Sequence, residues 1–285
     1  MAKTASPVAV VTGAASGIGR QLALQAASRG ARVAVVDIEA DRAAETVELI
    51  RRSGAEARAY GCDVANADDM LALANSVAAD IGDANWVFNN AGVIAGGTVE
   101  KTRITDAQWM FNVNVLGVLN GVQAFLPHLY RAVEAGGPAH IVNTGSENSV
   151  GVPLLGPTSV YTATKHAVLG LTDCIRRDLE GTGIKVTLLC PGLVQTDIFD
   201  ARRNRPEALG GAVRLPQDRA EAVRGMMKKD GQDPALTARL CFEAMDRGDF
   251  MLITDPKVRG FAEKRHREVG SALDRIDARL AQDDT

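Results

Sequence analysis

Tyr161 and Lys165 are the residues whose types and spacing best suit proton chemistry. They stand four positions apart in a run over residues 159–179 that is predicted to be helical, so their side chains share one face. A free tyrosine has a pKa near ~10, and a neighbouring ammonium group favours the phenolate and lowers that pKa. Ser146, fifteen positions upstream of Tyr161, could hydrogen-bond the same substrate oxygen. With its pKa lowered in this way, Tyr161 could donate a proton to a ketone oxygen or accept one from an alcohol.

The amino-terminal segment could hold a nucleotide. A β-branched run over residues 8–12 is typical of a buried parallel strand, and helical spacing resumes over residues 20–29. Between them lies Thr12-Gly-Ala-Ala-Ser-Gly-Ile-Gly19. A glycine-rich turn between strand and helix lets the backbone approach a pyrophosphate, and the helix N-terminus favours its charge. A tight turn that binds nothing is the alternative, because short glycine motifs also arise by chance.

Asp37 ends the second predicted strand, 24 residues after Gly13. An acidic residue at this offset accepts hydrogen bonds from the adenosine ribose and would repel a 2′-phosphate, so it favours NAD over NADP. Capping of the following helix, residues 39–52, is the alternative role. Arg20 and Arg42 are nearby cations that could weaken the discrimination.

Two more strand ends carry candidate nucleotide contacts. Asp63 follows the strand predicted over residues 57–60, and it could either meet the adenine edge or cap the helix over residues 67–81. The strand over residues 85–89 opens into Asn90-Ala-Gly92, whose small residues suit a crowded place beneath a cofactor.

Candidate residues also follow the next two strands. Ser146 lies just beyond the strand over residues 140–144, and Pro191-Gly192 follows the sixth strand, with Thr196 four residues further on. Ligands of open parallel sheets bind outside the carboxyl ends of the strands, which places these residues at the expected site. Thr196 could hydrogen-bond the cofactor or simply start the next helix.

Two segments lie outside the regular alternation. Residues 193–232 have weak periodicity and are predicted to form a substrate lid. The lid arginines, Arg202, Arg203 and Arg205, could receive an anionic substrate, although a solvated basic face is the favoured interpretation. Residues 256–285 are predicted to form a charged helical extension of unassigned role.

Alternating strands and helices predict one α/β domain over residues 1–285, a doubly wound parallel sheet of about seven strands with helices on both faces. The chain is 46% hydrophobic and 24% charged, an ordinary globular composition. A net charge of -3 gives no reason to expect a nucleic-acid or membrane partner. Four isolated cysteines without metal spacing indicate no metal site and reduced thiols in a cytoplasmic protein.

Taken together, these motifs make the sequence resemble the short-chain dehydrogenase/reductase family, in its single-domain branch. The matching features, in the family's order, are Thr12-Gly-x-x-x-Gly-x-Gly19, Asp63-Val64, Asn89-Asn-Ala-Gly92, Asn114, Ser146, Tyr161-x-x-x-Lys165 and Pro191-Gly192 with Thr196. The resemblance implies a Rossmann-like fold. It also implies a homodimer or homotetramer built on the helices over residues 106–131 and 159–179.

The resemblance also implies roles for these residues. Tyr161 would be the acid/base, Lys165 would bind the nicotinamide ribose and lower the tyrosine's pKa, and Ser146 would position the substrate oxygen. Asn114, which by its apolar helix alone would be an ordinary buried polar group, would hold a water linking Lys165 to solvent. The implied cofactor contacts are Gly13, Ser16, Gly17, Ile18, Gly19, Asp37, Asp63, Val64, Asn90, Ala91, Gly92, Tyr161, Lys165, Pro191, Gly192, Val194 and Thr196.

The leading hypothesis is therefore reversible oxidation of a secondary alcohol to a ketone with NAD. Mostly apolar stretches expected around the substrate, residues 93–97, 152–155 and 193–199, favour a bulky or aromatic molecule. One alternative is a nucleotide-sensing protein of the same fold that has lost its chemistry. Another is an epimerase or dehydratase of the extended branch, against which the glycine spacing argues.

Overall fold

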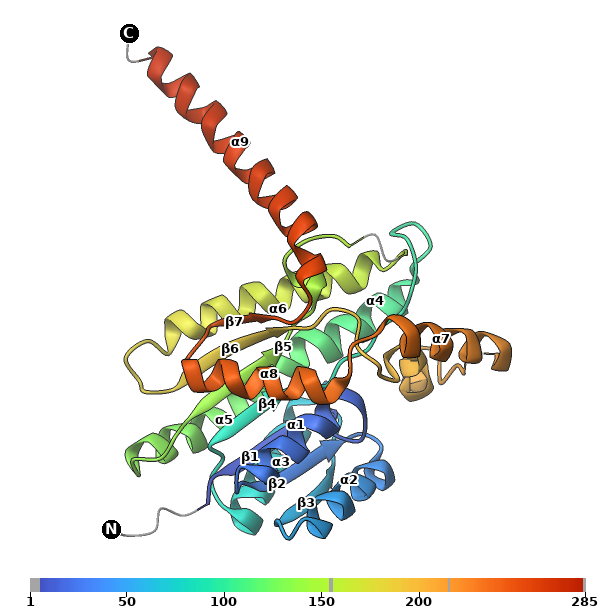
Figure 1. The fold of residues 1–285 in the computed structure, drawn as a ribbon, viewed down its shortest axis with the longest axis vertical. Coiled ribbons are helices and arrows are strands. Elements are labelled where there is room, and N and C mark those ends of the chain that lie inside the picture. The colour runs from blue at the N-terminus through green and yellow to red at the C-terminus, as the bar shows by residue number, and fades with distance from the viewer. Residues whose placement is uncertain (1–5, 154–155, 215, 284–285) are drawn as a thin grey trace.

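Seven parallel strands form one sheet at the centre of the computed structural model, which describes residues 6–153, 156–214 and 216–283 (Figure 1). The strand order is β3-β2-β1-β4-β5-β6-β7, so the direction of winding reverses between β1 and β4. The strands are β1 (Val8–Thr12), β2 (Arg32–Asp37), β3 (Ala57–Gly61), β4 (Trp86–Asn89), β5 (His140–Thr144), β6 (Lys185–Cys190) and β7 (Met251–Ile253). The predicted doubly wound α/β fold is confirmed.

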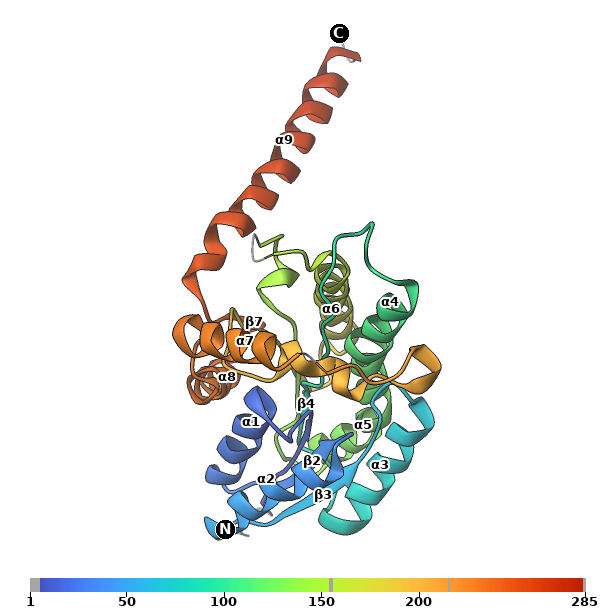
Figure 2. The same cartoon turned by 90° about the vertical axis from the view of Figure 1, so that its right-hand side faces the viewer.

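Helices cover both faces of this sheet. One face carries α1 (Gly17–Ser28), α2 (Ala40–Arg52) and α8 (Pro234–Arg247), and the other carries α3 (Ala67–Ile81), α5 (Gly117–Glu134) and α6 (Ser159–Asp178). Figure 2 shows α1 and α8 on one side of the strands and α3 and α5 on the other. The sheet is therefore the middle of three layers.

Strand β1 shows why its sequence reads as an unbroken apolar run. Val8 and Val10 pack in the core beneath α3 and α5, whereas Ala9 and Val11 pack in the core beneath α1, α2 and α8. Successive side chains of a strand point to opposite faces, and a strand buried on both faces needs apolar residues at every position. The site at the end of β1 thus rests on a rigid base.

The helix predicted over residues 106–131 is interrupted. It comprises α4 (Ile104–Phe111), a π-helical turn η1 (Asn112–Leu116) and α5. The stretch Ile104–Glu134 is long and apolar enough to cross a membrane, a length that sequence analysis does not anticipate, but half of its most apolar window is buried inside the fold. That burial is the expected state of a core helix.

The last two predicted segments have defined structure. Within residues 193–232 lie the 3₁₀ turns η3 (Ile198–Asn204) and η4 (Glu207–Leu209), followed by α7 (Gln217–Asp230), a helix that the weak periodicity does not predict. The chain then ends with η5 (Pro256–Val258) and α9 (Arg259–Asp283), which projects away from the body (Figures 1 and 2).

Candidate active site

The turn between β1 and α1 has a backbone that requires glycine. Gly13 and Gly17 have φ angles of +66° and +54°, a region that other residues enter only with strain. Thr12 fixes the turn to the end of β4, because its Oγ1 accepts hydrogen bonds from the backbone N–H groups of Asn90 at 3.0 Å and Ala91 at 3.1 Å. The predicted glycine turn and the Asn90-Ala-Gly92 loop therefore form one continuous surface.

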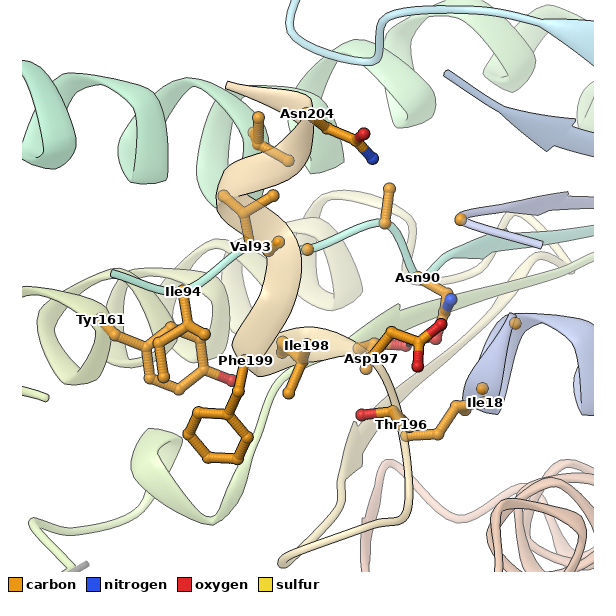
Figure 3. Close-up of a pocket in the computed structure, with 18 of the residues that line it drawn as sticks. Ile18, Asn90, Val93, Ile94, Tyr161, Thr196, Asp197, Ile198, Phe199 and Asn204 are labelled. Carbon is orange, nitrogen blue, oxygen red and sulfur yellow. Dashed lines mark hydrogen bonds between the residues drawn. The ribbon is translucent and has the colours of Figure 1, made fainter. Parts of the chain in front are cut away.

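The first turn of α1 presents its backbone to the same surface. Ser16 is the N-cap residue, and its side chain makes no capping hydrogen bond. The leading N–H groups of a helix have no partner within the helix, so this end suits a phosphate. Thr196 approaches from the opposite side, since a Cβ on Gly17 would lie 2.7 Å from Thr196 Cγ2. Figure 3 shows Thr196 beside Ile18.

Asp37 and Asp63 lie at the far end of this surface. The carboxylate of Asp37 accepts hydrogen bonds from the backbone N–H groups of Ala15 and Glu39, both at 3.0 Å, so it joins the glycine turn to the start of α2. Asp63 accepts one from the backbone of Ala65 at 3.0 Å. The alternative of Asp63 as the cap of α3 is wrong, because the Asn66 side chain caps that helix.

Helix α6 places Tyr161 and Lys165 on one buried face, as their spacing predicts. Lys165 Nζ lies 5.7 Å from the centroid of the Tyr161 ring and donates a hydrogen bond to the backbone carbonyl of Thr144 at 2.8 Å. Thr144 ends β5 and Ser146 follows it. The ammonium, the phenol and the hydroxyl therefore meet at the carboxyl end of the sheet.

A short 3₁₀ turn, η2 (Glu147–Ser149), holds Ser146 against α6. Asn148 Nδ2 donates to Thr162 Oγ1 at 2.7 Å, and Ser149 Oγ donates to the backbone carbonyl of Lys165 at 2.8 Å. Ser146 Oγ in turn donates to Asn148 Oδ1 at 3.1 Å. Sequence analysis misses Asn148 and Ser149, whose only signal is a polar run directly after the candidate serine.

Burial acts on both titratable groups of this centre. It raises the pKa of Tyr161 to about 12, although a hydrogen bond with the Ser146 side chain opposes the rise, and the charge of Glu147 adds to it. Burial lowers the pKa of Lys165 to about 8. The expected lowering of the tyrosine's pKa is not found, because desolvation of the phenolate outweighs the favourable contacts.

Asn114 lies in the π-helical turn η1 and is 0% exposed. Its side chain accepts a hydrogen bond from the backbone N–H of Val93 at 2.8 Å and donates to the Val93 carbonyl at 2.9 Å and to Thr164 Oγ1 at 3.0 Å. A Cβ added at Gly92 would lie 3.5 Å from Asn114 Oδ1 and 3.6 Å from Lys165 Nζ. Asn114 thus lies behind the site and fixes the loop after β4.

One cavity of about 670 Å³ joins the other predicted positions. It is lined by every predicted catalytic and cofactor-binding residue except Asn114, from Asp37 and Asp63 at one end to Tyr161 at the other. Near Tyr161 its wall includes Ile94 and Phe199 (Figure 3). Of the predicted substrate wall over residues 152–155, the last two residues lie outside the described part of the chain.

The lid arginines Arg202 and Arg205 do not form a solvated basic face, and neither is free to receive an anionic substrate. The Arg205 side chain is 0% exposed, with Nη1 3.2 Å from Asp106 Oδ1 and Nη2 donating to Thr105 Oγ1 at 2.8 Å. Arg202 Nη2 lies 3.2 Å from Asp106 Oδ2. Both guanidinium groups fasten the segment over residues 198–205 to α4, which corrects the prediction from sequence.

Arg203, the third arginine, joins the lid to α2 through Glu39. Arg203 Nη2 lies 2.7 Å from Glu39 Oε2, and Arg42 lies 3.0 Å from the same oxygen and 2.7 Å from Asp197 Oδ2. Burial alone would raise the pKa of Glu39, but hydrogen bonds from Arg203 and Asn204 and the two cationic charges lower it to about 2. Sequence analysis misses Glu39, which lines the cavity two residues after Asp37.

Comparison with known proteins agrees with this geometry. The family model for short chain dehydrogenases matches residues 7–207. The chain is 34% identical over 224 residues to the 1-deoxy-11-beta-hydroxypentalenate dehydrogenase of Streptomyces avermitilis, covering 78% of this chain and 81% of that protein. It is 30% identical over 264 residues to the C alpha-dehydrogenase of Sphingobium sp. strain SYK-6, covering 92% and 85%.

A solved structure extends the likeness to the whole fold. A short-chain dehydrogenase/reductase from Burkholderia phymatum, in complex with NAD, is 35% identical, with a TM-score of 0.85 over 95% of this chain and 97% of that one. The seven-stranded parallel sheet is therefore the fold that the sequence resemblance implies. The chain belongs to the short-chain dehydrogenase/reductase family of oxidoreductases.

Proposed function

We propose that this protein interconverts a secondary alcohol and a ketone with NAD, using Tyr161 as the acid/base. The observation that carries the proposal is the single cavity, which runs from a phosphate-binding glycine turn to a buried tyrosine, lysine and serine. Family membership supports a nicotinamide cofactor and oxidoreductase chemistry.

The residues along the cavity fit a nicotinamide dinucleotide. The start of α1 and the glycines at 13 and 17 leave room and N–H groups for the pyrophosphate, and Asp37 retains acceptor capacity for ribose hydroxyls. Lys165 and Tyr161 would hold the nicotinamide end, with Val194 and Thr196 alongside. When bound, this cofactor supplies the acceptor or donor of hydride.

The protein's own groups handle the proton. Tyr161 takes the hydroxyl proton of an alcohol, or returns it to a ketone oxygen, while Ser146 hydrogen-bonds the same oxygen. Holding substrate and cofactor together in the right orientation accounts for much of the acceleration. Asn114 Oδ1 and Lys165 Nζ face the same space beside Gly92, which supports the proposal that a water there connects the lysine with solvent.

Two features of the cavity guide the choice of substrate and cofactor. Val93, Ile94, Ile198 and Phe199 pack around Tyr161, so the reacting end favours a bulky or aromatic molecule. At the other end, the two carboxylates of Asp37 and Glu39 disfavour the 2′-phosphate of NADP.

We also propose a cytoplasmic homodimer or homotetramer. The long helix formed by α4, η1 and α5 exposes Phe111, Leu116 and Tyr130. Large exposed apolar side chains of this kind indicate a contact surface.

The test is a screen of the purified protein with NAD and NADP against aromatic, aliphatic and steroid alcohols and the matching ketones. We expect NAD-dependent oxidation of secondary alcohols, with the highest kcat/KM for aromatic ones. Tight nucleotide binding without turnover of any compound would contradict the proposal and indicate a nucleotide-sensing protein instead.

A further inference from the structure

Glu147 is a buried acid in the wall of the catalytic cavity that the reaction does not use. It directly follows Ser146 and is only 7% exposed, yet it lines the same cavity as Tyr161. Its backbone is fixed at both ends, because its N–H donates to the carbonyl of Pro191 at 2.8 Å and its carbonyl accepts from Val150 at 3.3 Å. The main chain of Glu147 is therefore fixed next to Ser146, and the charge of its side chain acts on Tyr161.

The carboxylate of Glu147 receives no hydrogen bond, and no cation lies within 4.0 Å of it, in the part of the chain that the structure describes. An ionised carboxylate in a mostly enclosed, apolar-walled site is costly unless a donor reaches it. None of the neighbouring polar side chains donates to this carboxylate. They form hydrogen bonds within the η2 turn or with α6, as seen for Ser146, Asn148 and Ser149. The carboxylate of Glu147 is thus available to accept a hydrogen bond from a molecule in the cavity.

We infer that Glu147 selects substrates that carry a hydrogen-bond donor, a hydroxyl or an ammonium group, close to the reacting carbinol. The inference rests on the proposed function, since Ser146 and Tyr161 define where the carbinol lies. A donor close to the carbinol would satisfy the carboxylate, whereas a plain alkyl group would leave it unpaired. Vicinal diols and amino alcohols with an aromatic ring combine this donor with the apolar wall around Tyr161.

The charge of Glu147 also sets a pH window for this selection. Burial and the neighbouring Asp255 raise its pKa to about 7, and Lys257 opposes the rise. The carboxylate is ionised above that pH, so preference for a donor is present there and weakens as the pH falls through it. The titratable groups whose charges act on Glu147, or on which it acts, are Tyr161 on α6, Asp255 at the start of η5 and Lys257 within η5.

The test compares the wild-type protein with Glu147→Gln, which keeps the shape of the side chain and removes its charge. The exposed Glu100→Gln serves as the matched control. Each protein is assayed with NAD on 1-phenylethanol, which lacks the donor, and on 2-amino-1-phenylethanol, which has it. Calorimetry measures binding of the amino alcohol to the protein–NAD complex, above and below neutral pH, whether or not turnover occurs.

We expect Glu147→Gln to lower the preference for the amino alcohol about tenfold or more, the effect of losing one charge-assisted hydrogen bond. Oxidation of 1-phenylethanol should change less than oxidation of the amino alcohol, since Glu147 acts on it only through the charge felt by Tyr161. Binding of the amino alcohol should lose the part of its pH dependence that lies near pH 7. Equal preference and equal binding in wild type and Glu147→Gln would overturn the inference and leave the proposed function intact. Wild-type binding that depends on Glu147, without turnover of these two compounds or of any alcohol in the wider screen, would support the site and contradict the proposed function.

Discussion

At the scale of single residues, burial in the catalytic centre disfavours the ionised forms of its titratable groups. Tyr161 and Lys165 are both held by the fold in a place that disfavours their ionised forms, with pKa values of about 12 and about 8. A phenol with a raised pKa stays protonated at neutral pH and can serve as the acid in ketone reduction. Alcohol oxidation needs the phenolate, which the hydrogen bond with Ser146 favours.

The adenosine end of the cavity yields a prediction about cofactor choice. Glu39 pairs with Arg203, which lines the cavity, whereas Arg42 also pairs with Asp197, so removal of Glu39 takes the carboxylate partner from Arg203 beside the place where a 2′-phosphate would lie. We expect Asp37→Ala to raise the NADP-to-NAD ratio of kcat/KM, and Asp37→Ala with Glu39→Gln to raise it further. We expect this ratio to rise about tenfold for each carboxylate removed, because hydrogen bonds to charged groups contribute roughly 1.5–3 kcal/mol.

Steady-state kinetics with each cofactor measures these ratios, and the exposed Glu56→Gln is the matched control. The control should keep the wild-type ratio. An unchanged ratio in the double variant would show that another group sets the cofactor preference.

Residues were predictable from the sequence where a local spacing carries the chemistry. Tyr161 and Lys165 are one helical turn apart, and Gly13 and Gly17 occupy positions that need positive φ angles. The role of Glu39 was not predictable from the sequence, because its partner Arg203 lies 164 residues away and only the fold brings the two together.

At the scale of elements, a chain of buried side-chain amides and hydroxyls fixes α6 to the sheet. Asn89 of β4 donates to Asn143 of β5 at 2.9 Å, and Asn143 donates to Thr172 of α6 at 3.1 Å. These two hydrogen bonds favour this arrangement, because losing either leaves a buried amide N–H unpaired, while Asn89 Oδ1 is already without a partner among the described residues. The chain therefore helps to hold the Tyr161 helix against β5.

The packing of α5 against the Asn89–Asn143 hydrogen bond gives a prediction about stability. A Cβ on Gly121 would collide with the amide of Asn89, whose Nδ2 is already committed to Asn143. We expect Gly121→Ala to lower the free energy of unfolding by about 2 kcal/mol, a typical cost of overpacking a core. Urea denaturation followed by circular dichroism measures the change.

The matched control is Gly170→Ala on α6, where an added Cβ meets no atom within 4 Å. Alanine is a better helix former than glycine by about 1 kcal/mol, so this variant should be at least as stable as the wild type. Equal stability of the two variants would contradict the close approach of α5 to β4.

Elements were predictable where hydrophobic periodicity is strong. The strands follow apolar runs such as that of β1, and α6 follows its regular spacing. The π-helical turn η1 was not predicted, because one extra residue in a helical turn barely alters the periodicity. Helix α7 was missed because its apolar face is sparse, with Met227 as its buried residue.

At the scale of the whole molecule, exposed apolar side chains lie on α4, η1 and α9, among other places in the described part of the chain. One such surface is the face of α4 and η1 that carries Phe111 and Leu116, and another is a stripe on α9 formed by Val269, Leu273, Ile276 and Leu280. Helix α9 stands clear of the body (Figure 1), so its stripe is distant from the sheet. The proposed subunit contact uses the first surface.

We therefore predict that Phe111→Glu combined with Leu116→Glu dissociates the oligomer. Two buried carboxylates in an apolar contact would each lose hydration without gaining a partner. Size-exclusion chromatography with light scattering should give the mass of one chain for this variant and a multiple of it for the wild type.

The comparison variant, Leu273→Glu combined with Leu280→Glu, changes only α9 and should leave the oligomer intact. Dissociation by the α9 variant alone would place the contact on α9 and contradict the proposed interface.

The most direct test of the reaction centre is the single-turnover rate of Tyr161→Phe with a secondary alcohol that the wild type oxidises, measured beside its affinity for NAD. The variant removes one hydroxyl from a buried ring and leaves the glycine turn, Asp37 and Lys165 in place to bind the cofactor. We predict a rate loss of about 10²–10⁴-fold, the usual contribution of a general acid or base, with NAD affinity nearly unchanged. A variant that turns over alcohol at the wild-type rate would remove Tyr161 from the mechanism.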